Sequence, residues 1–102
     1  MSDIKKARQA MLARILDGDG KSSPAQRKAA FNNTGLVGPL GTLIDKVATH
    51  ANTVTDENLA AVGAAGLSED QIFEIVVCAA IGQASRQYDA ALTALDAAAG
   101  KE

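Results

Sequence analysis

The stretch from Gly66 to Ala98 carries the longest continuous helical pattern in this sequence and constrains the fold most strongly. Ser68 is a favourable N-cap, and Gln71 follows at the three-residue spacing of a capping box. Beyond this start, apolar residues recur at steps of three and four, the spacing of one helix face. They are Phe73, Val77, Ala80, Ala84, Tyr88, Ala91, Leu95 and Ala98. The pattern predicts one long helix that ends near residue 98.

Part of this helix, residues 75–82, is apolar all round, which predicts that it is buried on every side. A short apolar run also occurs in buried strands, but the helical spacing continues past Tyr88 and favours a helix. Gly82 and its small neighbours Ala79, Ala80 and Ala84 would let another helix approach closely.

Four shorter helical patterns precede the long one. They cover approximately residues 3–16, 24–33, 40–51 and 56–66. The second has the start signal of Ser23 as N-cap, Pro24 at the first helical position and Gln26 completing the box. No strand pattern and no internal repeat is visible. The sequence therefore predicts an all-α fold, a compact bundle of about five helices with a long buried C-terminal helix.

Length and composition indicate how large the core of such a bundle is. A chain of 102 residues has the size of one domain, which we place over residues 1–102. Apolar residues make up 47% of the chain but aromatic residues only 3%. An alanine-rich core buries little area per residue, so we expect additional burial through self-association, that is, a homo-oligomer.

Charge and cysteine content exclude several classes of protein. The net charge is −2 and there is no block of basic residues, so we expect no nucleic-acid partner. We expect no membrane span and no signal peptide, because no apolar run has the required length. A single cysteine, Cys78, forms no intrachain disulfide. These features predict a soluble, cytoplasmic protein.

Two short motifs resemble ligand-binding loops only in part. The segment from Asp17 to Lys21 begins like a calcium loop, but the sixth and twelfth positions of that loop would be Ser22 and Lys28. We interpret it as a helix-stopping turn and predict no metal site. The glycines at 35, 38 and 41 follow no strand, so they indicate a flexible loop instead of a dinucleotide site.

Cys78 and His50 are the residues with the greatest chemical potential. Cys78 lies in the apolar run IVVCAAI, where burial raises a thiol pKa, so a structural role is favoured over a nucleophile. His50 is the only histidine, and we place it at the edge of the third helix, within roughly one turn of Asp45 and Lys46. A packed or half-solvated histidine is the favoured interpretation, and a general acid/base or ligand contact is the alternative.

Arg86 follows the apolar run directly. Its spacing from Asp89 predicts a surface ion pair. The alternative is that Arg86 holds an anionic ligand, if this part of the helix borders a cleft.

The segment AAGLSEDQIFEIVVCAAIGQASRQYDAALTALDAA, preceded by LIDKVATHANTVTDENLAAV, resembles the carboxymuconolactone decarboxylase-like superfamily, which includes the alkylhydroperoxidase D-like proteins. The resemblance covers roughly residues 36–98. It implies an all-helical domain that assembles into trimers or hexamers and works without a cofactor.

Peroxidase members of this superfamily use two cysteines, a histidine and an acidic residue. Counting back from Gly66, the resemblance places these at Ala51, Val54, Asn58 and Pro39, none of which is the required residue type. A dithiol mechanism needs two thiols. A thiol-dependent peroxidase is therefore the least favoured function.

Two main hypotheses follow. The first is a non-redox, oligomeric member that binds a ligand or is catalytically silent. The alternative is a cofactor-free lyase or decarboxylase acting on a small lactone or carboxylic acid, with His50 as catalytic residue and Asn58, Arg86 and Lys46 as ligand-binding residues. A weaker third hypothesis is an interaction subunit that works with a separate enzyme.

Overall fold

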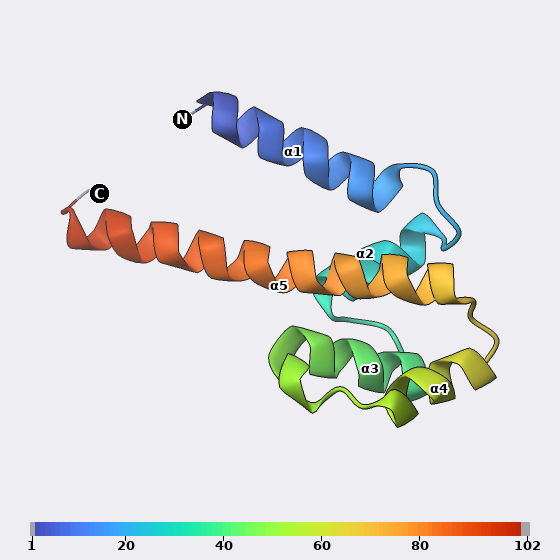
Figure 1. Cartoon of the computed structure of the whole chain (residues 1–102). Coiled ribbons are helices and arrows are strands. Elements are labelled where there is room, and N and C mark those ends of the chain that lie inside the picture. Colours follow the sequence, from blue (N-terminus) through green and yellow to red (C-terminus); the bar gives the residue numbers. More distant parts are fainter. Residues whose placement is uncertain (1, 101–102) are drawn as a thin grey trace.

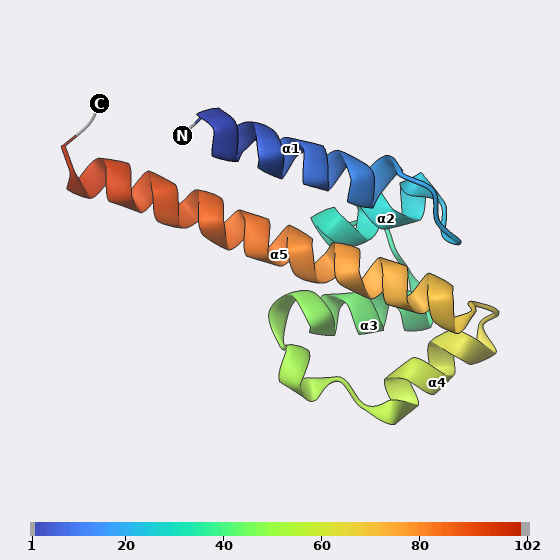
Figure 2. The ribbon, with the colours of Figure 1, turned by 45° about the horizontal axis from the view of Figure 1, so that its top comes forward.

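A computed structural model describes residues 2–100 of the chain (Figures 1 and 2). The helices are α1 (Ser2–Asp17), α2 (Pro24–Asn32), α3 (Gly38–Thr49), α4 (Asp56–Ala64) and α5 (Glu69–Ala98), with a short 3-10 turn at Ala51–Thr53. The described residues contain no strand. The predicted all-α fold, with five helices and a long C-terminal one, is confirmed.

Side-chain caps mark the starts of α2, α4 and α5. Ser68 accepts a hydrogen bond from the backbone of Gln71 at 3.2 Å, and the Gln71 side chain accepts one from the backbone of Ser68 at 2.8 Å. Ser23 accepts from the backbone of Gln26 at 3.1 Å. Each such cap stabilises a helix by about 0.5–2 kcal/mol. The predicted starts of the second and fifth helices are therefore correct.

The core lies where α2, α3 and α4 pack around the N-terminal half of α5. Its buried side chains are Ala30, Leu40, Leu43, Ile44, Val62, Ile75, Cys78 and Ala79. Most of the packing against α5 comes from α2 and α3. The core contains no buried aromatic side chain among the described residues, in line with the low aromatic content.

Helix α5 is buried on one side and over only part of its length. Within residues 75–82, the prediction of burial on every side is correct for Ile75, Cys78, Ala79 and Gly82 but wrong for Ala80, which is exposed. Every residue from 86 to 98 is exposed. The physical reason is that α2 and α3 cover one side of the helix and end before its C-terminal half (Figure 1).

The molecule is elongated because α5 projects beyond the other helices. Its extents are 51 × 29 × 19 Å and its radius of gyration is 15.5 Å, whereas a compact domain of this length has about 13 Å. Helix α1 runs alongside α5 in the opposite direction, and the C-terminal end of α5 extends past the start of α1 (Figures 1 and 2). Across residues 2–100, none of the helices combines the length and apolar character that crossing a lipid bilayer requires.

Candidate functional site

An apolar groove lies between α4 and the start of α5. Its volume is about 580 Å³. The lining residues are Leu59, Ala60, Gly63, Leu67, Glu69, Ile72, Phe73 and Val76. We call this hollow the α4–α5 groove.

Small residues on α4 create this groove. Val62 is buried in the core, whereas Ala60 and Gly63 of α4 are exposed and line the groove. A Cβ added at Gly63 would meet no atom within 4 Å. The small side chain of Ala60 and the absence of one at Gly63 leave space beside Ile72 and Phe73, and Phe73 remains 69% exposed.

The charge around the α4–α5 groove is acidic. Glu69 is the only charged residue that lines it. Helix α4 and residues 69–85 of α5 carry five Asp and Glu and no Lys or Arg, and Lys46 of α3 donates to Asn58 of α4. The groove therefore offers an apolar floor next to a carboxylate, without a cation of its own to bind an anionic ligand.

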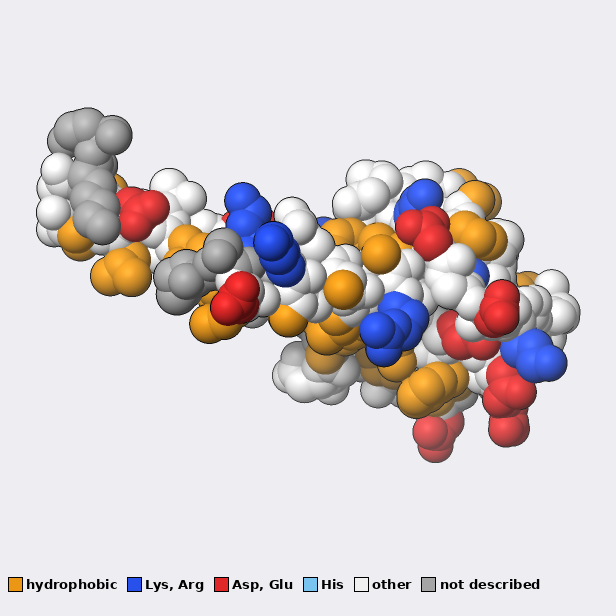
Figure 3. Space-filling model, turned by 90° about the horizontal axis from the view of Figure 1, so that it is seen from above, with side chains coloured by type: hydrophobic (Ala, Val, Ile, Leu, Met, Phe, Trp, Pro, Cys, Tyr) orange, Lys and Arg blue, Asp and Glu red, His pale blue; other side chains and the backbone are white. Residues whose placement is uncertain are grey.

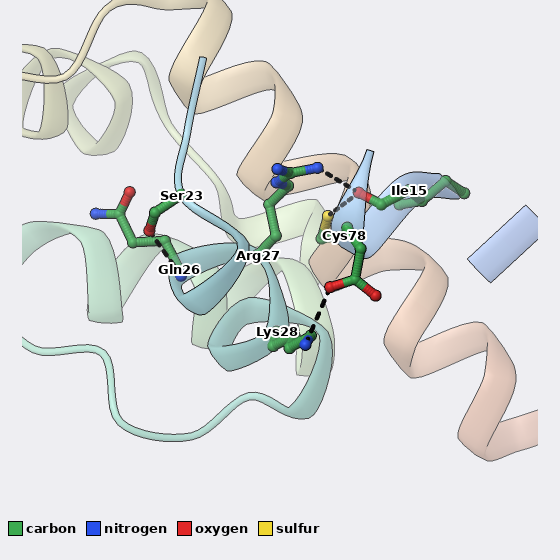
Figure 4. A network of polar contacts seen from close by, with 7 residues as sticks. Ile15, Ser23, Gln26, Arg27, Lys28 and Cys78 are labelled. Carbon is green, nitrogen blue, oxygen red and sulfur yellow. Dashed lines mark hydrogen bonds and ion pairs between the residues drawn. The ribbon is translucent and has the colours of Figure 1, made fainter. Parts of the chain in front are cut away.

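A second, smaller pocket of about 190 Å³ lies under the C-terminal end of α1 and contains Arg27 and Cys78. Arg27 is only 4% exposed, and its Nη1 donates to the carbonyl of Ile15 at 3.0 Å. Its Nε has no hydrogen-bond partner in residues 2–100. The Cys78 thiol lies 4.0 Å from the same carbonyl of Ile15 (Figure 4).

The environment of Cys78 makes it unreactive. Burial raises the pKa of the thiol, and the Glu74 carboxylate acts in the same direction, while the Arg27 guanidinium opposes the shift. A thiol with a raised pKa is protonated near neutral pH, and the protonated form is a poor nucleophile. The predicted structural role of Cys78 is consistent with its burial in the core.

Glu74 also lines the smaller pocket, but its carboxylate is occupied by the turn after α1. It accepts hydrogen bonds from the backbone N–H groups of Lys21 and Ser22 at 2.8–2.9 Å and from the Ser22 hydroxyl at 2.7 Å. These bonds, the Lys21 N–H first, lower the pKa of Glu74 from 4.5 to about 2. Glu74 is therefore an ionised anchor for the turn and has no proton to donate near neutral pH.

Two of the predicted ligand-binding residues come together. Lys46 Nζ donates to Asn58 Oδ1 at 3.1 Å. The same oxygen also accepts from the backbone N–H of Thr55 at 2.9 Å, and the backbone N–H of Asn58 donates to the Thr55 hydroxyl at 3.2 Å. These reciprocal bonds form the capping box of α4. Both side chains thus have a structural explanation.

The other two predicted site residues lie elsewhere. His50 is exposed beyond the end of α3, and its Nδ1 lies 3.0 Å from the hydroxyl of Thr49. Arg86 donates to the backbone carbonyl of Phe31 at 2.6 Å and to Gln83. No side-chain hydrogen bond in residues 2–100 joins His50 or Arg86 to Lys46 or Asn58, and the contact of His50 with Lys46 is the backbone bond from the His50 N–H to the Lys46 carbonyl at 2.7 Å.

The predicted ion pair between Arg86 and Asp89 is wrong, because both side chains have other partners. Asp89 pairs with Arg8 of α1 at 3.2 Å. Arg86 instead donates a hydrogen bond to the backbone carbonyl of Phe31. It lines neither the α4–α5 groove nor the smaller pocket.

The sequence did not indicate three features of structural or binding importance. They are Arg27, Glu74 and the apolar lining of the α4–α5 groove. Arg27 precedes Ala30 by three residues, so helical periodicity alone places it on the buried side of α2. No local signal identifies Glu74, because its partners lie more than 50 residues away in the sequence.

Comparison of this chain with family profiles, curated proteins and solved structures gives no match.

Proposed function

We propose that this chain is a non-redox ligand-binding domain, similar to the carboxymuconolactone decarboxylase-like superfamily but without its dithiol. The ligand is an uncharged or cationic small molecule with an apolar body, and it binds in the α4–α5 groove. We also propose a cytoplasmic location, which the single cysteine supports.

The observation that carries the proposal is the lining of the α4–α5 groove. Its volume of about 580 Å³ lies within the range of roughly 300–1,000 Å³ that is typical of small-molecule sites. Leu59, Leu67 and Ile72 provide apolar surface, and burying such surface contributes about 25 cal/mol per Å². No pair of groups suited to acid–base catalysis lines the groove among the described residues, which favours binding over turnover.

The charge of the groove decides the class of ligand. An anionic ligand would approach Glu69 with no nearby Lys or Arg on α4 or the start of α5. Like charges repel, whereas a cation would be attracted. Of the small molecules that the family resemblance implies, a neutral lactone fits this groove better than a carboxylic acid.

The test uses three probes with the same alkyl chain: a lactone, a trimethylammonium and a carboxylate. We expect the first two to bind more tightly than the carboxylate, and to shift the backbone NMR signals of Gly63, Leu67 and Ile72. Calorimetric titration gives the affinities.

The matched variants are Gly63→Leu and Gly63→Ala. Leucine fills the groove, whereas alanine adds one methyl into open space. Gly63→Leu should weaken binding at least about tenfold, equivalent to about 1.4 kcal/mol, and Gly63→Ala should change it little. Equal binding by both variants, or tightest binding of the carboxylate, contradicts the proposal.

A cofactor-free lyase acting on a small lactone or carboxylic acid is the second candidate. The contact between Lys46 and Asn58 favours it, because it places a cation and an amide side by side. This function predicts lactone turnover that falls in Lys46→Met and in His50→Ala. Lactone binding without turnover supports the ligand-binding proposal instead.

A further inference from the structure

We propose that the projecting end of α5, residues 87–98, packs against α5 of a second copy of this chain, in a contact that reaches back to Ile81 of each copy. We call this segment the arm. The arm lies further along α5 than Val76, the last residue that lines the α4–α5 groove. This proposal is therefore independent of ligand binding in the groove.

The arm is a helix without a covering element. All of its residues are exposed. Arg8 of α1 contacts it: the guanidinium lies 5.0 Å from the centre of the Tyr88 ring and pairs with Asp89. Isolated helices shorter than about 12–15 residues are marginally stable in water. A helical end that carries Tyr88, Leu92 and Leu95 therefore gains stability if a partner covers it.

The arm continues a heptad pattern, as in a coiled coil, that begins before it at Ile81. Ile81, Tyr88 and Leu95 are seven residues apart, and Ala84, Ala91 and Ala98 form a second set with the same spacing, three residues further on. These are the two core positions of the heptad repeat. Leu92 lies next to this stripe and is also exposed. Apolar side chains line the projecting arm in the space-filling view (Figure 3).

The alternation of large and small residues selects an antiparallel arrangement. In a parallel pair, equal positions meet, so Tyr88 would oppose Tyr88 and Ala91 would oppose Ala91. In an antiparallel pair centred between Tyr88 and Ala91, each large residue opposes an alanine: Tyr88 meets Ala91, Leu95 meets Ala84, and Ile81 meets Ala98. Large-to-small pairing fills a helix interface evenly.

The single chain exposes more area than a compact monomer of its mass, enough to supply one side of an interface. The chain exposes 6664 Å². A compact monomer of this mass exposes about 5,400 Å², so the excess is roughly 1,300 Å². Each partner in a standard-size interface contributes about 800 Å². Residues of α1 beside the arm, Ile4 and Met11, add to the uncovered apolar surface.

Charge complementarity also favours a second copy. Helix α1 carries four basic and two acidic residues, whereas α5 carries one basic and five acidic residues. Two arms that cross would place the basic α1 of each copy near the acidic α5 of the other. Arg8 and Asp89 already make this kind of contact within one chain. A two-fold contact is compatible with a dimer or with a hexamer built from pairs, but not with a simple three-membered ring.

The first test is sedimentation equilibrium of the full chain and of Leu95→Glu. Leu95 is 63% exposed in the single chain, so the substitution leaves the fold intact, as circular dichroism would verify. The matched control is Phe73→Glu, a substitution on the same helix at a residue that is 69% exposed but lies outside the arm.

We expect the unmodified chain to self-associate, Leu95→Glu to weaken association at least a hundredfold, and Phe73→Glu to leave it unchanged. A monomeric unmodified chain at all concentrations overturns the proposal. So does association that survives Leu95→Glu, or that Phe73→Glu disrupts equally.

Disulfide cross-linking tests the antiparallel register. The double variant Ala84→Cys/Leu95→Cys should link two copies under oxidising conditions, because these positions face each other across the interface. Leu95→Cys alone should not link, since its partner position is alanine. Cys78 is buried and does not compete. Efficient linking by Leu95→Cys alone indicates a parallel pair and overturns the antiparallel arrangement.

Discussion

Gly82 of α5 lies directly against the backbone carbonyl of Phe31 at the C-terminal end of α2. A Cβ at residue 82 would overlap this carbonyl oxygen and would lie 2.6 Å from its carbon. One turn further along α5, Arg86 donates a hydrogen bond of 2.6 Å to the same oxygen. Residues four apart lie on one face of a helix. Gly82 therefore lets α2 approach, and Arg86 holds its end in place.

The first prediction concerns this contact. Gly82→Ala should destabilise the fold by about 1–3 kcal/mol, because the added methyl forces two backbones apart. The higher helix propensity of alanine, worth about 1 kcal/mol, offsets part of this loss. Urea unfolding followed by circular dichroism measures the difference. Gly63→Ala is the control: it lies in open space and should be neutral or stabilising by up to about 1 kcal/mol. Equal stability of the two variants contradicts the packing described for Gly82.

The second prediction is a dependence of stability on pH through Glu74. Its pKa is about 2 in the folded chain, below the ordinary value of 4.5, because the Lys21 and Ser22 N–H groups and the Ser22 hydroxyl bind the ionised form. A carboxylate with a lowered pKa in the folded chain stabilises the fold at pH values above its unfolded-state pKa. This contribution is lost as the pH falls toward the folded-state pKa. The stabilisation from Glu74 should therefore be complete above about pH 4.5 and decline toward pH 2.

The variant Glu74→Gln isolates this effect. Its difference from the unmodified chain in unfolding free energy should be constant near neutral pH and shrink between about pH 4.5 and pH 2. Glu57→Gln removes an exposed carboxylate of α4 and should leave most of the acid dependence in place. A Glu74→Gln difference that does not vary over this range argues against the anchoring of the turn by Glu74.

The third prediction concerns the reactivity of Cys78. Burial raises its pKa and shields it, so a thiol reagent such as DTNB should label it only when the chain opens. Labelling in the folded state should be slower than in urea by roughly a hundredfold or more, since access requires local unfolding. The control is Ala61→Cys in a Cys78→Ser background, which places a thiol on the exposed side of α4. Equally fast labelling of both would show that Cys78 is accessible.

The fourth prediction separates structural roles from catalytic ones. Asn58→Ala removes the acceptor for the Thr55 N–H and for Lys46, and should cost about 1 kcal/mol of unfolding free energy. His50→Ala removes an exposed side chain beyond α3 and should change stability by less than about 0.5 kcal/mol. Urea unfolding of both variants measures this. A larger effect from His50→Ala than from Asn58→Ala would contradict the contacts described here.

The helices could be predicted from the sequence because their signals are local. Ser68 and Gln71 are three residues apart, and the cap that they form needs no other part of the chain. The same holds for Ser23 with Pro24, and for the apolar spacing along each helix. The burial of Cys78 could also be predicted, because it is surrounded in sequence by apolar residues on every side of the helix.

The candidate site could not be predicted in the same way. The proposed convergence of His50, Arg86, Lys46 and Asn58 required knowledge of how separate helices are oriented. Only Lys46 and Asn58 meet, because α3 and α4 are neighbours, whereas Arg86 reaches the end of α2. The α4–α5 groove depends on which side of α4 faces the core, and this choice is made by Val62 packing against other helices.

The sequence by itself determined the number of helices, the starts of α2 and α5 and the unusual length of α5, since caps and periodicity act within a few residues. Only the tertiary structure decided which side of α5 is buried. The regular stripe from Phe73 to Ala98 is largely exposed, while the side with Ile75, Cys78, Ala79 and Gly82 is buried. The physical reason is the packing between helices. At Gly82 the backbone of α2 can approach α5 closely, and the hydropathy pattern along α5 alone does not show which side α2 covers.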